Sequence, residues 1–169
     1  MRRAIAIVPQ GSWPDSEAVA TVTLAYHDRH RRRVRMKTDD DNAFMLDLPQ
    51  AAMLRDGAGL ALEGGGYIRV RAAHEAVADI FCSFADDRAR IAWHIGNRHV
   101  PLQVLPGGAL RILDDHVLVD MVRGLGARVI CYRASFAPES GAYAGGHDHG
   151  HDHDHDHDHR HEHGAGHGP

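Results

Sequence analysis

The feature that most limits how this chain folds is its last 24 residues, Gly146–Pro169, in which histidine and aspartate alternate. They hold ten of the 16 histidines and no apolar residue larger than Ala165. Such a segment buries too little surface to offset the entropy lost on ordering, so we expect it to be disordered without metal. About 145 residues remain to form a core, enough for one ordinary domain or two small ones.

This tail also has the composition of a metal-binding sequence. Neutral imidazole nitrogen suits zinc, copper and nickel, and neighbouring carboxylates help to offset the charge of a bound dication. A purification tag and a low-complexity end without a role are the two other interpretations, but purification tags are usually consecutive histidines. We predict that the ten tail histidines are metal ligands: His147, His149, His151, His153, His155, His157, His159, His161, His163 and His167.

The negative charge of the chain belongs to the tail. The tail contains six acidic residues and one arginine, Arg160, whereas the whole chain has a formal charge of −4. The rest is therefore close to neutral and has no broad basic surface of the kind that binds nucleic acid. Its one basic cluster, Arg29–Arg35, is interpreted as a solvated turn and strand, with an acidic partner surface as the alternative.

Targeting and redox features favour a soluble, cytoplasmic protein. Ala4–Val8 is too short for the core of a signal peptide, and no apolar run of 18 residues occurs. Cys82 and Cys131 lie far apart and outside any CxxC motif, which fits a reducing compartment better than a disulfide scaffold. We expect no association with a membrane.

Residues 1–75 have the patterning of a small all-β domain. Five segments are predicted to be strands: Val19–Tyr26, Arg33–Thr38, Ala43–Leu48, Leu60–Leu62 and Tyr67–Ala72. Turn residues at Asp39–Asn42 and Gly64–Gly66 separate some of them. Short strands at this spacing predict a sandwich or a barrel.

Residues 76–145 alternate strands with helices. Two helices are predicted, Asp86–Asn97 and Asp115–Gly124. Each begins with an acidic residue and has a glycine near its end. Four strands are predicted around them: Val77–Ser83, Pro101–Leu105, Ala109–Leu113 and Ala127–Arg133. The order β-α-β-β-α-β is that of the ferredoxin-like fold. We therefore predict an α+β protein with an N-terminal all-β domain (1–75), a C-terminal ferredoxin-like domain (76–145) and a disordered histidine-rich tail (146–169).

Three histidines lie at or near the ends of elements in this second domain: His94, His99 and His116. For His94 and His116, a capping or core role competes with metal ligation. A single imidazole at His99 gives only a labile metal site. In a dimer with a twofold axis, however, two copies of His99 can meet and share one ion. Such a site is exposed and under-coordinated, which suits passing metal on.

Several motifs carry a family resemblance. GNRHVPLQ ends at Gln103 and DHVL spans Asp115–Leu118, and further matches are Leu54–Gly57, Leu110–Ile112, Phe136–Glu139 and Gly141–Tyr143. In this order, over essentially the whole chain, they resemble the UreE family of urease accessory proteins. The resemblance implies a nickel metallochaperone rather than an enzyme. It also implies a homodimer whose N-terminal domain is peptide-binding-like and whose ferredoxin-like domain binds metal.

The resemblance also implies residue roles. The histidine of GNRH, His99 here, matches the central ligand contributed by both subunits, and His116 matches a further ligand of some members. Some members have a histidine two positions earlier, where this chain has Asp114. His94 is interpreted as structural, with Trp93 in place of the usual tyrosine. The resemblance implies Ni(II) as the bound ion. Because imidazole sites also accept other ions, we expect Zn(II) and Cu(II) to bind in vitro as well.

The implied partners are the urease accessory GTPase and, through it, the apo-urease activation complex. The main alternative is a metal-storage or detoxification protein without a delivery role. A metallohydrolase fits poorly, because catalytic zinc usually has three protein ligands and a nearby base, and no HExxH-like spacing occurs outside the tail.

Overall fold

The computed structural model describes residues 1–140, which form two β-sheets with separate hydrophobic cores. A six-stranded sheet precedes a four-stranded sheet that carries two helices. This confirms the predicted α+β class, an all-β region followed by a β-α-β-β-α-β arrangement. The predicted disordered tail, with its ten histidines, lies outside the described residues.

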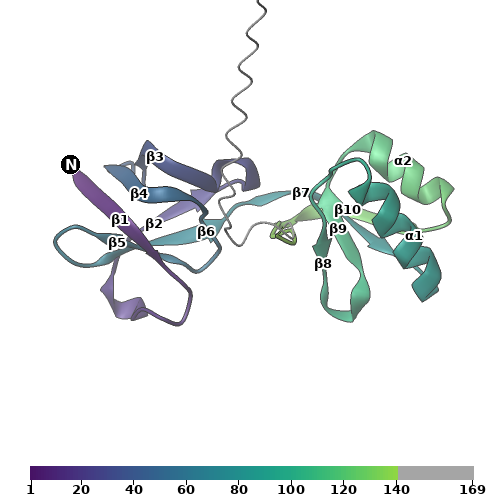
Figure 1. Cartoon of the computed structure of the whole chain (residues 1–169), viewed down its shortest axis with the longest axis horizontal. Helices are drawn as coiled ribbons and strands as arrows, with labels where there is room; N and C mark the ends of the chain where they lie inside the picture. The colour runs from purple at the N-terminus through teal and green to yellow at the C-terminus, as the bar shows by residue number, and fades with distance from the viewer. Residues whose placement is uncertain (141–169) are drawn as a thin grey trace, which may run out of the picture. The chain divides into compact units, whose positions relative to one another are not determined.

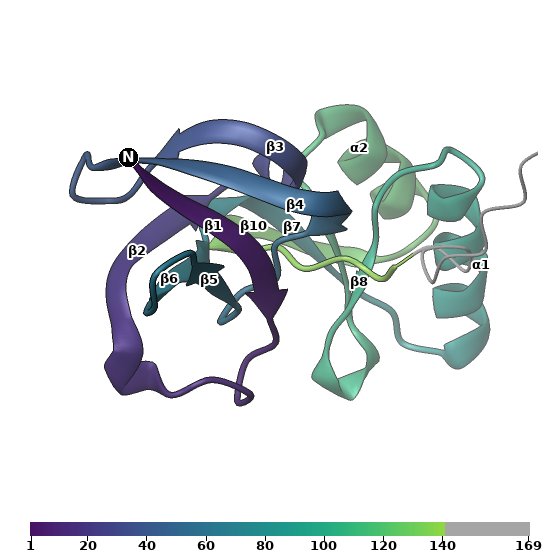
Figure 2. The same cartoon turned by 60° about the vertical axis from the view of Figure 1, so that its left-hand side comes forward.

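The first sheet has the strand order β2-β6-β5-β1-β4-β3 and curves around its core (Figure 2). Its strands are β1 (Arg2–Val8), β2 (Ala18–Leu24), β3 (His30–Lys37), β4 (Ala43–Met53), β5 (Gly59–Leu62) and β6 (Tyr67–Ala72). Single 3-10 turns, η1 (Asp15–Glu17) and η2 (Tyr26–Asp28), precede β2 and β3. Alternate residues of β4, Phe44, Leu46 and Leu48, are buried, as expected for a strand with one face on a core.

Two features of this sheet differ from the prediction. β1 was not predicted as a strand, yet it is central, pairing in parallel with β4 and antiparallel with β5. β4 was expected to end at Leu48, before Pro49, but it continues to Met53. Its second half pairs again with β3 beyond an irregularity between Arg31 and Arg33, and proline is tolerated in strands at such places.

The second sheet has the order β10-β7-β9-β8 with antiparallel neighbours, the arrangement of a ferredoxin-like fold. Its elements are β7 (His74–Phe81), α1 (Ala85–Gly96), β8 (Gln103–Val104), the 3-10 turn η3 (Pro106–Gly108), β9 (Leu110–Leu113), α2 (His116–Gly124) and β10 (Arg128–Ser135). Both helices cover one face of the sheet (Figure 1). Ile91 and Ile95 of α1 and Val122 of α2 are buried against Ile80 and Ile112. Within the described residues, neither helix has the length and apolar character needed to cross a membrane.

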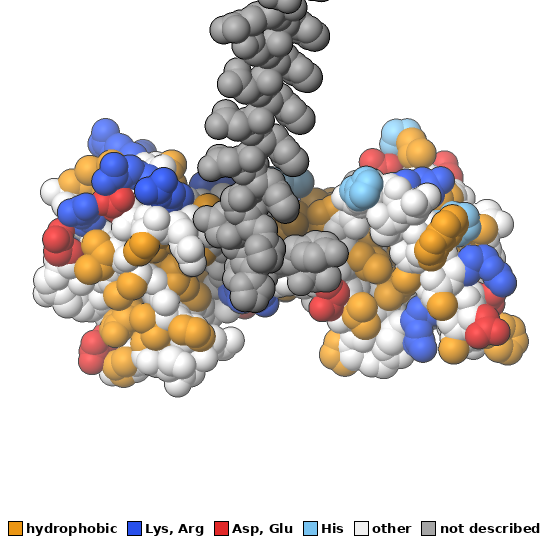
Figure 3. Space-filling view, viewed as in Figure 1, with side chains coloured by type: hydrophobic (Ala, Val, Ile, Leu, Met, Phe, Trp, Pro, Cys, Tyr) orange, Lys and Arg blue, Asp and Glu red, His pale blue; other side chains and the backbone are white. Residues whose placement is uncertain are grey.

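The basic cluster Arg29–Arg35 is not uniformly solvated. Lys and Arg side chains gather over β3 and β4 in the view of Figure 3, and Arg33 Nε lies 2.7 Å from Asp47 Oδ1. Arg29, in contrast, is 2% exposed. Its guanidinium donates to the Phe136 carbonyl, and burial lowers its pKa. The predicted solvated face was therefore wrong for Arg29, which ties the first sheet to the residue after β10.

The face of the second sheet that the helices leave uncovered contains a buried ion pair. Arg111 in β9 donates to both carboxylate oxygens of Asp79 in β7, at 2.6 and 3.0 Å, and to the Ser135 carbonyl at 2.9 Å. The Tyr132 hydroxyl of β10 donates to Asp79 Oδ2 at 2.7 Å. Burial raises the pKa of Asp79, but the hydrogen bonds from Arg111 and Tyr132 outweigh it, so this pKa lies below its ordinary value.

Replacing Asp79 by asparagine is expected to lower the free energy of unfolding by about 3 kcal/mol, because Arg111 keeps a buried charge without its carboxylate. Since folding lowers the pKa of Asp79, this stabilisation is complete above the unfolded carboxyl pKa of about 3.9 and is lost at lower pH. Urea unfolding at neutral pH measures it. Asp120→Asn, in an exposed pair with Arg123, serves as the control and should change stability by less than about 0.5 kcal/mol. Equal effects of the two changes would contradict this role of Asp79.

Candidate metal centre

His99 lies in the turn that ends α1, and its backbone has a left-handed conformation, with φ of 56°. The His99 amide donates to the Gly96 carbonyl at 2.9 Å, and the Val100 amide donates to the Ile95 carbonyl at 3.5 Å. These two bonds around a residue of positive φ form a Schellman motif, the common way to end a helix. His99 therefore occupies the position that glycine most often holds.

The turn holds the backbone of His99 firmly while its side chain stays in solvent. Ile95 is fully buried, and Val100 packs against the same core, so the residues that close the motif are anchored on both sides of His99. The His99 side chain is exposed and forms no hydrogen bond or ion pair with the described residues. Both ring nitrogens are thus available to an external ligand.

A side chain at this position has an energetic cost. Left-handed backbone is disfavoured for residues with a Cβ by roughly 1–2 kcal/mol, although histidine adopts it more often than most. Closing the turn therefore does not require an imidazole, and glycine would suffice. A residue that costs stability and forms no hydrogen bond or ion pair with residues 1–140 is a candidate for a functional role.

His94 has local partners instead. It is half-buried in the last turn of α1, its ring lies 4.9 Å from that of Trp93, and its carbonyl accepts a hydrogen bond from Arg98 at 2.8 Å. Trp93 itself is 62% exposed. These contacts agree with a structural role for His94, which stays a prediction.

His116 is the first residue of α2, and its side chain does not cap that helix. The cap is Asp115, whose Oδ1 accepts from the amides of Val117 and Leu118 at 2.9 and 3.0 Å. The imidazole of His116 is exposed and unpaired within the described part of the chain. The capping alternative to ligation is thereby removed for His116, while its role as a ligand stays a prediction.

Asp114 takes the place of the extra histidine implied for some family members. It contacts a cysteine that is distant from it in the sequence. Cys131 Sγ in β10 lies 3.7 Å from Asp114 Oδ1. Burial and, next, the charge of Asp114 raise the pKa of the Cys131 thiol. Because metal binds the thiolate, this shift makes Cys131 a less favourable ligand than an ordinary thiol.

The described residues of one chain do not form a complete metal site. No group of three or more histidine, cysteine, aspartate or glutamate side chains suited to holding an ion occurs among residues 1–140. His99 and His116 are accordingly exposed imidazoles outside any preformed cage in this part of the chain. The ten predicted ligands of the tail lie outside the described residues.

Two of the quoted motifs meet in the structure. Gln103, which ends GNRHVPLQ, accepts a hydrogen bond from the Ala137 amide at 3.0 Å through its side chain. The Glu139 amide donates to the Leu102 carbonyl at 2.8 Å, and the Val104 amide donates to the Glu139 carboxylate at 3.4 Å. The segment after β10 is thus bound alongside the segment that follows His99.

Comparison with known proteins identifies the family. The family model described as the UreE urease accessory protein N-terminal domain matches residues 3–73, and that of the C-terminal domain matches residues 75–163. The chain belongs to the UreE family. The resemblance given by the GNRHVPLQ and DHVL motifs is therefore confirmed, and UreE proteins are accessory proteins rather than enzymes.

Individual UreE relatives match most of the chain. The urease accessory protein UreE of Bradyrhizobium sp. (strain BTAi1) is 48% identical over 144 residues, covering 85% of this chain and 69% of the relative. UreE of Rhodobacter capsulatus is 45% identical over 146 residues, covering 86% of this chain and 89% of the relative. UreE of Beijerinckia indica subsp. indica is 44% identical, with 86% and 83% covered.

The left-handed turn predicts how substitutions at His99 affect stability without metal. His99→Gly should leave the free energy of unfolding unchanged or raise it by up to about 1 kcal/mol, because glycine adopts positive φ without strain but loses more backbone entropy. His99→Val should lower it by about 1–2 kcal/mol, because a β-branched residue fits this conformation poorly. Urea unfolding in the presence of a chelator measures both. A glycine variant less stable than the valine variant would contradict the conformational argument.

Proposed function

We propose that this UreE protein is a cytoplasmic nickel metallochaperone that binds Ni(II) and delivers it for assembly of the urease metallocentre. The observation that carries the proposal is His99, an exposed imidazole on an anchored turn in a position where glycine would serve the fold as well or better. Its role as a ligand follows from this placement and from the family resemblance. Nickel as the cargo rests on the family, since imidazole binds copper and zinc at least as readily.

In this proposal the protein is a homodimer in which both copies of His99 hold one ion. A single exposed imidazole binds metal weakly, and the described part of one chain brings no further pair of ligands to it. A twofold axis doubles the ligand. Trp93 and Val117, each 62% exposed, lie in the same helix ends as the candidate ligands and would be covered by such a contact.

The tail has a different role, that of a reservoir. Its alternating histidines offer many interchangeable donor pairs, so they capture ions by mass action without selecting one geometry. His116 is an auxiliary ligand in this scheme. Residues 1–75, 76–145 and 146–169 then correspond to a partner-binding domain, a metal-binding domain and the reservoir. The boundary of the two family matches, between residues 73 and 75, supports the first division.

Calorimetric titration with Ni(II) tests this two-part scheme. Deleting residues 146–169 should remove most bound ions and leave about one tightly bound ion per dimer. His99→Gly in the shortened chain should abolish that ion while the turn stays intact. Sedimentation of the same samples checks that they are dimers. Loss of all binding on deletion, or an unchanged titration of the glycine variant, would refute the role of His99.

Delivery is tested through the implied partners, the urease accessory GTPase and the apo-urease activation complex. The full chain should capture the GTPase from solution only when Ni(II) is present, and His99→Gly should weaken this capture. A storage protein, the alternative function, needs no such partner. Full metal loading without capture of the GTPase would therefore favour storage.

A further inference from the structure

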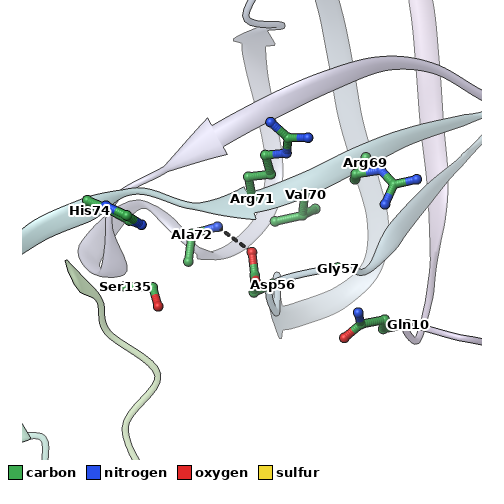
Figure 4. A pocket seen from close by; sticks show the side chains of 9 residues that line it. All are labelled: Gln10, Asp56, Gly57, Arg69, Val70, Arg71, Ala72, His74 and Ser135. Atoms are coloured by element: carbon green, nitrogen blue, oxygen red, sulfur yellow. Dashed lines mark hydrogen bonds between the residues drawn. The ribbon is translucent and has the colours of Figure 1, made fainter. Parts of the chain in front are cut away.

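The LRDG motif, Leu54–Gly57, builds one wall of a cleft of about 290 Å³ (Figure 4). Asp56 Oδ1 accepts a hydrogen bond from the Ala72 amide at 2.7 Å, which holds the motif against the end of β6. Gly57 has a φ of 74°, and a Cβ there would lie 2.5 Å from the side chain of Gln10. Glycine is thus required for Gln10 to take its place in the cleft.

Basic side chains dominate the rest of the lining. Arg69 and Arg71 alternate along β6 and so share one face of the strand. His74 of β7 and Ser135 of β10 lie opposite each other in the strand register and complete the cleft. Among the lining residues Asp56 is the single carboxylate. The lining itself thus contains two arginines and one carboxylate.

Most of the polar side chains here are uncommitted. Arg69 pairs with Asp15 at 2.8 Å. The side chains of Arg71, His74, Gln10 and Ser135, in contrast, form no hydrogen bond or ion pair within residues 1–140. A cleft whose lining includes an arginine without an ion pair and further polar side chains has the composition of a carboxylate-binding site.

We propose that this cleft binds a carboxylate side chain in an acidic segment of a partner protein, with Arg71 as the ion-pairing residue and His74, Gln10 and Ser135 as further donors. A volume near 300 Å³ is at the lower end of ligand pockets and admits a side chain with its flanking backbone. The inference goes beyond the proposed function and does not depend on metal binding.

The cleft suits a carboxylate better than a phosphate. Phosphate sites generally use free backbone amides, but here the Gly57 amide donates to the Val70 carbonyl at 3.0 Å and the Ala72 amide donates to Asp56. The charge of Asp56 in the same lining also repels a doubly charged phosphate more strongly than a singly charged carboxylate. These two amides are therefore not available to the ligand, and the side-chain donors of the lining take their place.

The test uses the full chain, kept free of metal with a chelator, and a short fluorescein-labelled peptide of alternating alanine and aspartate. Fluorescence anisotropy at low ionic strength should show binding, whereas the same peptide with asparagine should not bind. Arg71→Gln should weaken binding about tenfold or more, since hydrogen bonds between charged groups are lost. Arg32→Gln, an exposed arginine of β3 without a partner in the described part of the chain, is the matched control and should have little effect.

Three outcomes would overturn the proposal. Equal weakening by Arg71→Gln and Arg32→Gln would show attraction by net charge alone. Retained affinity in both Arg71→Gln and His74→Gln would exclude the cleft. Displacement of the peptide by inorganic phosphate at lower concentrations than by acetate, lost in Arg71→Gln, would identify a free phosphate ligand. His99→Gly should bind the peptide normally, so failure of the nickel-carrier proposal and failure of this one are distinguishable.

Discussion

The buried ion pair between Asp79 and Arg111 joins the strands of the second sheet on the face that the helices do not cover. It connects β7 to β9 directly and β10 through Tyr132, so three of the four strands share one polar cluster. Arg111 also binds the Ser135 carbonyl, the last residue of β10. An isolated charge on this face would be costly, whereas a paired and fully hydrogen-bonded one fixes a single register.

The path of the chain after that cluster follows from three further contacts. Buried Arg29 donates to the Phe136 carbonyl. The Gln103 side chain then accepts from the Ala137 amide, and the Glu139 carboxylate accepts from the Val104 amide. Arg29 Nε is the one buried side-chain polar atom without a hydrogen bond among residues 1–140, so this junction is retained at an energetic cost. The residues that follow His99 are thus held by backbone and side-chain bonds to residues 137–139. The imidazole belongs to a turn whose two ends are both fixed.

Local signals were sufficient for some elements but not for others. Tyr67–Ala72 and the α2 helix, with Asp115 before it and Gly124 at its end, were predicted nearly as observed, because alternation and caps are written in neighbouring residues. β1 was missed because its role depends on pairing with β4 and β5, more than 35 residues away. The left-handed backbone at His99 was equally hidden, since positive φ is normally inferred from glycine. The contact of Cys131 with Asp114 and the cleft at Arg71 both arise where separate strands meet, which no spacing in the sequence encodes.

The chemistry of the two candidate sites keeps their ligands apart. A cleft lined by Arg69 and Arg71 repels a divalent cation, so bound metal does not compete with an acidic partner for that cleft. Conversely, imidazole nitrogens of the kind proposed as ligands at His99 suit a transition-metal ion rather than a carboxylate. In the proposed carrier, this separation would let an acidic partner bind the cleft whether or not the metal site is loaded. If His99 holds metal as proposed, a site with few ligands would release its ion to a partner with more, and recognition need not weaken for release to occur.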